Sequence, residues 1–128
     1  MSVSRDRVIT TEEVRELVTY REETGTLRWN KRTAKQFSDS WRDKDKEAQK
    51  FNARYAGTRA FGSKYKNGRR YGSFKQVQYR ADEIVWIYFG NELPEKGFHL
   101  VHIDKDVTND RIENLKIVDA EEFRESYK

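Results

Sequence analysis

The residues that could carry chemistry lie close together in "LVHIDKDVTNDRIENL", which runs from Leu100 to Leu115. A histidine follows a short apolar run, and a loop rich in Asp and Asn follows the histidine. An imidazole can exchange a proton near neutral pH, and carboxylate and amide oxygens can ligate a hard cation. Taken alone, however, a histidine such as His102 is more often an ordinary strand residue, so the surrounding pattern must decide its role.

The acidic loop after this histidine is better explained as a turn than as a calcium site. Asp104, Asp106, Asn109 and Asp110 all offer oxygen atoms. The glycine and the terminal glutamate of an EF-hand loop are missing at the required spacing. Asp and Asn side chains bond to the backbone two residues further on, which stabilises turns.

The composition describes a small, strongly charged domain. Of its 128 residues, 38% are charged, 35% are hydrophobic and 13% are aromatic. There is no cysteine, which excludes disulfides and thiolate zinc sites. No apolar run approaches the length of a membrane span, and the first residues lack the apolar stretch of a signal peptide. We therefore expect a soluble, cytoplasmic protein with no membrane partner.

Positive charge is concentrated in the middle of the chain. Residues 31–80 carry 15 Lys and Arg against four Asp and Glu, whereas residues 81–128 carry six against 12. Aromatic residues alternate with the basic ones, a combination typical of nucleic-acid binding. The alternative is a solvated surface that only keeps the protein soluble. We interpret the segment as a DNA-binding region.

The first half of the chain predicts one helix, several strands and one ambiguous segment. Residues 1–9 are expected to form a loose tail, and Thr10 with Glu13 forms a capping-box pattern that begins a helix. A turn at Thr24-Gly25 leads into a strand through Leu27 and Trp29. Residues 31–53 form either a solvated helix anchored by Trp41 or a partly mobile insertion.

The second half predicts a regular succession of elements. Asn67-Gly68 between two β-friendly runs is a strong hairpin signal, and "KQVQYRA" predicts a further strand. "ADEIVWIYFGN" predicts a buried helix with Gly90 as its C-terminal cap. The remaining predictions are a strand at His99–Ile103, a loop at Asp104–Asn109, a short helix near Asp110–Asn114, a strand at Leu115–Val118 and a helix from Asp119.

Two stretches together resemble the small HNH homing-type endonucleases of bacteriophages. "YREETGTLRW" is similar to the family's opening "Y-D-P-x-T-G-x-L-x-W". "YRADEIVWIYFGNELPEKGFHLVHIDKDVTNDRIENLKIV" is similar to the family's strand–helix–loop entry followed by "D-H-I-N-G-D-x-x-D-N-R-I-x-N-L-R". The resemblance leaves out only residues 1–19 and the basic insertion at 31–55.

The resemblance implies an α+β fold, with a ββα-metal C-terminal half after a basic, β-hairpin-rich N-terminal half. We accordingly divide the chain into a tail and N-terminal helix (1–19), a basic strand-rich DNA-binding region (20–80, with the insertion at 31–55) and an HNH-like ββα region (81–128). In this family one divalent ion acts with the histidine on a phosphodiester. The resemblance implies that His102 is the general base and that Asn114 ties the hairpin and orients the histidine.

The chain departs from the family pattern where the family binds its metal. The two ligand positions fall at Val101 and Phe123, neither of which has a donor atom. Asp82-Glu83 stands where the family has His-Arg, and Asp104-Lys105 stands where it has Asn-Gly. Asp104 shares a strand face with His102 and, like Glu122 beside position 123, is a possible substitute ligand. We expect no cofactor, or Mg²⁺ or another divalent cation if the chain is active.

These observations lead to a DNA-binding protein of the HNH family with weak or lost nicking activity. Its expected partner is double-stranded DNA. Two alternatives stay open: an active HNH endonuclease that uses substitute ligands, and a phage protein that binds and inhibits a protein of its bacterial host. The expected DNA contacts are Lys64, Lys66, Arg69, Arg70, Lys75, Arg80, Arg111 and Lys116.

Overall fold

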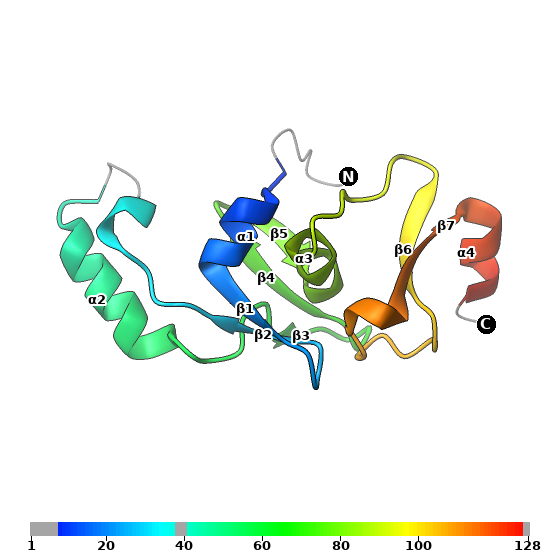
Figure 1. Cartoon of the computed structure of the whole chain (residues 1–128), viewed down its shortest axis with the longest axis horizontal. Coiled ribbons are helices and arrows are strands. Elements are labelled where there is room, and N and C mark those ends of the chain that lie inside the picture. The colour runs from blue at the N-terminus through cyan, green and yellow to red at the C-terminus, as the bar shows by residue number, and fades with distance from the viewer. Residues whose placement is uncertain (1–7, 38–40, 127–128) are drawn as a thin grey trace.

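The computed structural model describes residues 8–37 and 41–126. Helix α2 lies at one end of the long axis, and the strands β6 and β7 lie with α4 at the other end (Figure 1). The elements and their bounds are α1 (Thr11–Leu17), β1 (Val18–Arg21), β2 (Thr26–Trp29), η1 (Ala34–Gln36), α2 (Lys44–Tyr55), β3 (Ser63–Lys64), β4 (Arg70–Phe74), β5 (Val77–Arg80), α3 (Ala81–Tyr88), β6 (Phe98–His102), η2 (Ile112–Asn114), β7 (Leu115–Asp119) and α4 (Ala120–Ser126).

The predicted capping box begins α1. The Thr10 side chain accepts a hydrogen bond from the Glu13 amide, and the Glu13 carboxylate accepts one from the Thr10 amide. Two apolar residues of α1, Val14 and Leu17, are buried. The prediction of a loose tail is wrong at Ile9, which is buried and whose amide donates to the Tyr79 hydroxyl at 3.0 Å. Residues 1–7 of that predicted tail lie outside the described residues.

Strands β1 and β2 pair antiparallel around the predicted turn, with Val18 opposite Trp29. The ambiguous segment that follows contains the 3-10 turn η1 and the helix α2, so a helix is present there. The contacts of this helix centre on Phe51, whose ring packs edge-on against Trp29 at 5.9 Å. Trp41, the predicted anchor, lies before α2 and is 48% exposed.

Strands β3, β4 and β5 form an antiparallel sheet. Its first turn is the predicted Asn67-Gly68 turn, in which Gly68 has a φ of +84° and the Asn67 side chain accepts from the Arg69 amide at 2.9 Å. A positive φ suits glycine because it has no Cβ. The hairpin prediction is therefore confirmed, as is the strand β5 that follows it.

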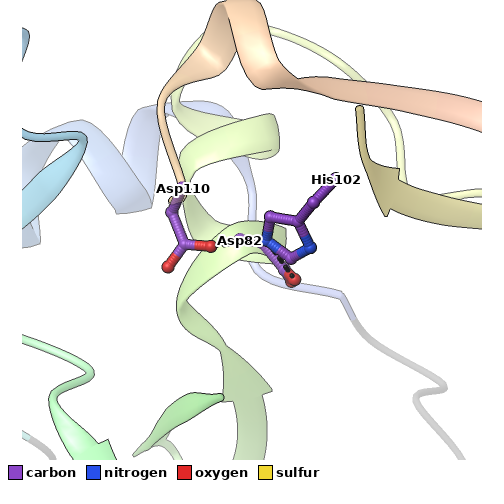
Figure 2. Close-up of side chains that lie close together, drawn as sticks. All are labelled: Asp82, His102 and Asp110. Carbon is purple, nitrogen blue, oxygen red and sulfur yellow. Dashed lines mark hydrogen bonds and ion pairs between the residues drawn. The ribbon is translucent and has the colours of Figure 1, made fainter. Parts of the chain in front are cut away.

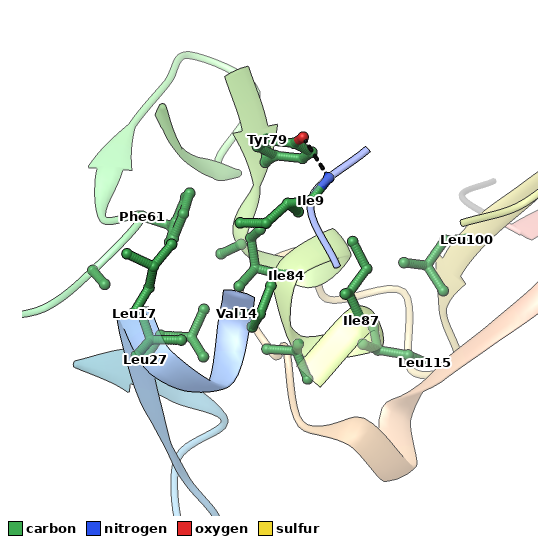
Figure 3. Close-up of a cluster of buried hydrophobic side chains, with 14 residues drawn as sticks. Ile9, Val14, Leu17, Leu27, Phe61, Tyr79, Ile84, Ile87, Leu100 and Leu115 are labelled. Carbon is green, nitrogen blue, oxygen red and sulfur yellow. Dashed lines mark hydrogen bonds between the residues drawn. The ribbon is translucent and has the colours of Figure 1, made fainter. Parts of the chain in front are cut away.

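Helix α3 lies at the centre of the hydrophobic core (Figure 3). Its buried residues Ile84 and Ile87 lie between α1 on one side and the β6–β7 pair on the other, which contributes Leu100 and Leu115. The predicted helix is confirmed, and Gly90 follows its C-cap with a φ of +85°. The core thus joins residues from the N-terminal helix to the last strand.

Strands β6 and β7 form an antiparallel pair with His102 opposite Leu115, and α4 packs against both strands. The predicted strands, the short helical turn before β7 and the final helix are therefore confirmed. Mixed helices and strands confirm the predicted α+β class. Within the described residues, no helix combines the length and the apolar character needed to cross a membrane.

Candidate functional site

The loop after β6 is held together by Asn114. Its side-chain oxygen accepts from the Asp104 amide at 3.0 Å, and its Nδ2 donates to Asp104 Oδ1 at 2.9 Å and to the Asn109 carbonyl at 2.8 Å. The Ile103 amide donates to the Asn114 carbonyl at 2.7 Å. These bonds fix the start and the end of the loop to each other, and so fix the end of β6 next to the start of β7.

His102, the last residue of β6, points into the protein. Its side chain is fully buried, with Nε2 2.8 Å from Asp110 Oδ1 and 3.6 Å from Asp82 Oδ2. Figure 2 shows the imidazole facing both carboxylates, one from the first turn of α3 and one from the loop before β7. A general base must reach the water or hydroxyl that it deprotonates. In this arrangement Nε2 is already hydrogen-bonded to the carboxylate of Asp110.

Two arginines neutralise Asp82, which is 2% exposed. Arg80 Nε lies 2.9 Å from Oδ1, and Arg69 Nη1 lies 3.1 Å from Oδ2. Burial raises the pKa of Asp82 above its ordinary value, and Arg80 opposes this shift. Burial alone would lower the pKa of Arg80, but the carboxylates of Asp82 and Glu83 raise it above its ordinary value. Both oxygens of Asp82 are therefore engaged by guanidinium groups.

In the described part of the chain, Asp82, His102 and Asp110 form a group of residues of metal-ligating types. Their potential ligand atoms lie within 4.8 Å of one another. They do not fit a hard cation such as Mg²⁺, which keeps several waters and demands near-octahedral geometry. All three side chains are buried, and hydrogen bonds within the protein already use their facing atoms. An ion would have to displace a guanidinium from Asp82. The cluster is a charge-compensated polar network.

The two positions where the resemblance implies metal ligands hold hydrocarbon side chains. Val101 is 1% exposed. The Phe123 ring, on α4, stacks on the imidazole of His99 at 4.0 Å between centroids. Valine and phenylalanine have no atom that could ligate a metal ion. Val101 is buried and Phe123 is half-buried. At these two positions the side chains between the β6–β7 hairpin and α4 are therefore apolar and offer no ligand atom.

An open pocket of about 260 Å³ remains beside these residues, at the outer edge of the hairpin and α4. Glu122 lines it, but its Oε2 lies 3.6 Å from Lys116 Nζ. The expectation that Asp104 shares a strand face with His102 is wrong, because β6 ends at His102. The carboxylate of Asp104 instead accepts bonds from the Asn109 and Asn114 side chains and from the Asp106 amide. These bonds lower the pKa of Asp104.

The predicted DNA-binding side chains divide into two groups. Lys64 and Lys66 are exposed near the tip of the β3–β4 hairpin. The others are engaged within the protein: Arg69 and Arg80 with Asp82, Arg70 with the Gly62 carbonyl, Lys75 with Glu13, Arg111 with the Glu23 carbonyl and Lys116 with Glu122.

Sequence reasoning missed the roles of Asp82 and Asp110. Asp82 was noted only as a departure from the family's His-Arg pair, and Asp110 only as one of several turn residues. A usable signal was present, because a carboxylate in the first turn of an otherwise apolar helix must be buried with a partner. The identity of that partner depends on tertiary packing, which no local pattern encodes.

Comparison with known proteins gives one match. Residues 79–123 match the family model described as HNH endonuclease. No curated protein and no solved structure gives a significant match to the chain. The matched segment begins at β5, includes Asp82, His102, Asp110 and Asn114, and ends within α4 at Phe123. Over this segment the chain is similar to an HNH-type nuclease family.

Proposed function

We propose that this protein binds double-stranded DNA and that its HNH segment does not cleave it. The observation that carries this proposal is that buried Val101, and Phe123 stacked on His99, stand at the two positions where the resemblance implies metal ligands. In this proposal β6, β7 and α4 correspond to the ββα-metal unit of the family without its ion. The HNH match supports DNA as the ligand.

Cleavage without the ion would lack its largest source of charge stabilisation. A bound divalent cation neutralises the phosphate and the leaving oxygen and supplies a nucleophilic hydroxide. A general base alone contributes on the order of 10²–10⁴-fold, which is far below what phosphodiester hydrolysis requires. His102 is also buried against Asp110, so it lacks access to a phosphodiester.

The basic middle segment supports DNA binding through one face of α2. Lys46, Lys50 and Arg54 are exposed and follow one another at intervals of four residues. At 3.6 residues per turn, their side chains fall within about 80° of the helix circumference. Gln49 and Ala53 lie on the same face, and Glu47 at its edge pairs with Lys50 at 3.5 Å. We name Lys46, Lys50 and Arg54 the α2 basic face, and propose that it contacts the phosphate backbone.

A plasmid assay tests the proposal. The full chain is incubated with supercoiled plasmid and Mg²⁺ or Mn²⁺, and binding to a short duplex is measured by fluorescence anisotropy at several salt concentrations. We expect salt-dependent binding and no nicking with either metal. If the wild type nicks the plasmid with a metal and His102→Ala does not, the proposed loss of cleavage is overturned. Absence of duplex binding at low salt would overturn the binding function.

A second candidate function is cleavage by substitute ligands, favoured by the gathering of Asp82, His102 and Asp110. It requires the Asp82–Arg69 and Asp82–Arg80 pairs to open so that an ion can enter. In that case Mn²⁺ would raise the melting temperature of the wild type and not that of Asp82→Asn. The same nicking assay then decides whether the bound ion supports cleavage.

A further inference from the structure

Three arginines gather where β2, the segment before β3, and β4 meet. Arg28 on β2 forms an isolated antiparallel bridge with Arg59. The aliphatic part of Arg59 lies over Gly62, since a Cβ on Gly62 would be 3.1 Å from Arg59 Cγ. Arg70 Nη1 donates to the carbonyl of the same Gly62 at 2.6 Å. These contacts bring all three arginines onto one short stretch of backbone.

In the described part of the chain, no carboxylate is paired with this cluster. Within residues 8–37 and 41–126, none of Arg28, Arg59 and Arg70 forms a salt bridge. The hydrogen bonds of Arg28 and Arg70 go to backbone carbonyls, which carry no net charge. Arg28 Nε is buried and has no hydrogen-bond partner. The neighbouring Arg69 and Arg80 differ, because both are paired with Asp82.

The cluster repels itself in the folded protein. Partial burial lowers the pKa of Arg59, and the positive charges of Arg70 and Arg28 lower it further. Asp110 acts in the opposite direction, but its carboxylate is already bonded to His102. Like charges held together without counter-charges destabilise a fold, and such arrangements are concentrated at functional sites. An anion from outside the chain would complete the cluster.

We propose that Arg28, Arg59 and Arg70 form a binding site for a backbone phosphate of duplex DNA, an inference that rests on the proposed DNA-binding function. The guanidinium fork matches two phosphate oxygens with parallel hydrogen bonds, and it keeps its charge at every physiological pH. Bonds to the Gly57 and Gly62 carbonyls hold two of the three forks in position before a ligand arrives. Arg59 is exposed, so a phosphate can reach it.

The site would connect the two ends of the molecule. Arg59 follows four residues after the last turn of α2 ends at Tyr55, and it lies within electrostatic reach of Asp110 in the HNH segment. A phosphate held here would sit between the α2 basic face and the β6–β7 hairpin. The DNA would then cross the middle of the protein. The neighbouring Arg69 and Arg80 could not attract it alone, because Asp82 neutralises them.

The test is duplex binding by Arg59→Gln, with Lys96→Gln as a matched control. Both variants remove one exposed positive charge, and Lys96 lies in the turn before β6, away from the cluster. For Arg59→Gln we expect affinity to fall about tenfold at moderate salt and the slope of log K against log salt to lose about 0.9. Lys96→Gln should bind as the wild type does. Equal binding by the two variants would overturn the phosphate site.

Thermal unfolding separates a binding role from a structural one. Because Arg59→Gln relieves repulsion, we expect its melting temperature to equal or exceed that of the wild type. A lowered melting temperature would overturn the inference, since the arginine would then stabilise the fold. Arg59→Lys keeps the charge and loses the fork. It should retain the salt slope and bind more weakly than the wild type.

Two further outcomes are informative. Inorganic phosphate at constant ionic strength should raise the melting temperature of the wild type more than that of Arg59→Gln. If it does so while both bind duplex DNA equally, the site takes free phosphate and the DNA assignment is overturned. If the wild type binds no duplex at all, the proposed function itself has failed, a result distinct from a failure of this site.

Discussion

The Nε2 atom of His102 lies 2.8 Å from Oδ1 of Asp110, inside the protein. The position and spacing of His102 follow the HNH pattern, and residues 79–123 match that family. Its imidazole is nevertheless buried against two carboxylates, those of Asp110 and Asp82, and two arginines pair with Asp82. The side chain therefore acts as a structural link between β6, α3 and the loop before β7.

Replacing His102 by alanine should destabilise the fold. The change leaves the buried Asp110 without this hydrogen-bond partner, and an unsatisfied buried polar group costs about 3 kcal/mol. Urea denaturation measures this loss of unfolding free energy. His99→Ala, which removes a half-buried imidazole stacked on Phe123, is the control and should cost about 1 kcal/mol. Unchanged stability in His102→Ala, together with a loss of plasmid nicking, would instead identify a catalytic base.

Restoring ligands at the family positions should create a metal site. Val101→Asp alone buries an uncompensated carboxylate, and we expect it to lower stability by about 3 kcal/mol. Adding Phe123→Asn supplies a second oxygen donor, so Mn²⁺ should raise the melting temperature of the double variant and leave that of the wild type unchanged.

The control for this experiment is Val118→Asp, because Val118 is buried in the neighbouring strand opposite His99. It should be destabilised to a similar degree, and Mn²⁺ should not rescue it. Equal rescue of the two aspartate variants would mean that the metal binds any new carboxylate, and the assignment of position 101 would be wrong.

Local signals predicted most of the elements. The capping box at Thr10, the Asn67-Gly68 turn and the glycine after α3 each have a short-range physical cause, and each is confirmed. The segment around α2 was ambiguous because its apolar face is narrow. Ala48 is its one buried apolar residue, and Phe51 packs on Trp29 from another element. Such a contact cannot be read from the helix sequence.

The polar site was harder to predict than the fold. The apolar residues at positions 101 and 123 were visible in the sequence, and the structure packs both of them. The pairing of Arg69 and Arg80 with Asp82 was not visible in the sequence. An arginine near a hairpin has the same sequence pattern whether it pairs with a buried carboxylate or is exposed and contacts phosphate. Whether a basic side chain faces solvent or a buried carboxylate is decided by the packing of β4 and β5 against α3.

Acid should loosen the loop after β6. Bonds from Asn109, from the Asp106 amide and from Asn114 lower the pKa of Asp104 in the folded state. A carboxylate with a lowered folded-state pKa stabilises the fold above its unfolded pKa, and this contribution disappears as the pH falls through the folded pKa. Asp104→Ala should therefore reduce stability at neutral pH, and the difference from the wild type should shrink on acidification.

Chemical denaturation at a series of pH values measures this dependence. Glu95→Ala removes an exposed carboxylate from the turn before β6 and serves as the control. A stability difference between wild type and Asp104→Ala that is constant from neutral to strongly acidic pH would contradict the role of the ionised carboxylate in holding the loop.

Neutralising the α2 basic face should weaken DNA binding without unfolding the protein. The triple variant Lys46→Gln, Lys50→Gln and Arg54→Gln changes exposed side chains only. If each contacts one phosphate, the slope of log K against log salt should decrease by about 2 to 3. Anisotropy titrations at several salt concentrations measure this slope. An unchanged slope would mean that α2 lies away from the DNA.

The turn between β1 and β2 should be sensitive to a single methyl group. Gly25 has a φ of +71°, and a Cβ there would lie 2.5 Å from the Arg111 amide nitrogen, next to Asp110. Gly57 has a φ of +83° and open space around it, so Gly57→Ala isolates the backbone strain, about 1 kcal/mol. Gly25→Ala adds a clash with the backbone, and we expect a total loss of about 2 to 4 kcal/mol. Thermal or urea denaturation of the two variants measures the difference, and equal losses would show that the turn does not press against the loop that carries Asp110.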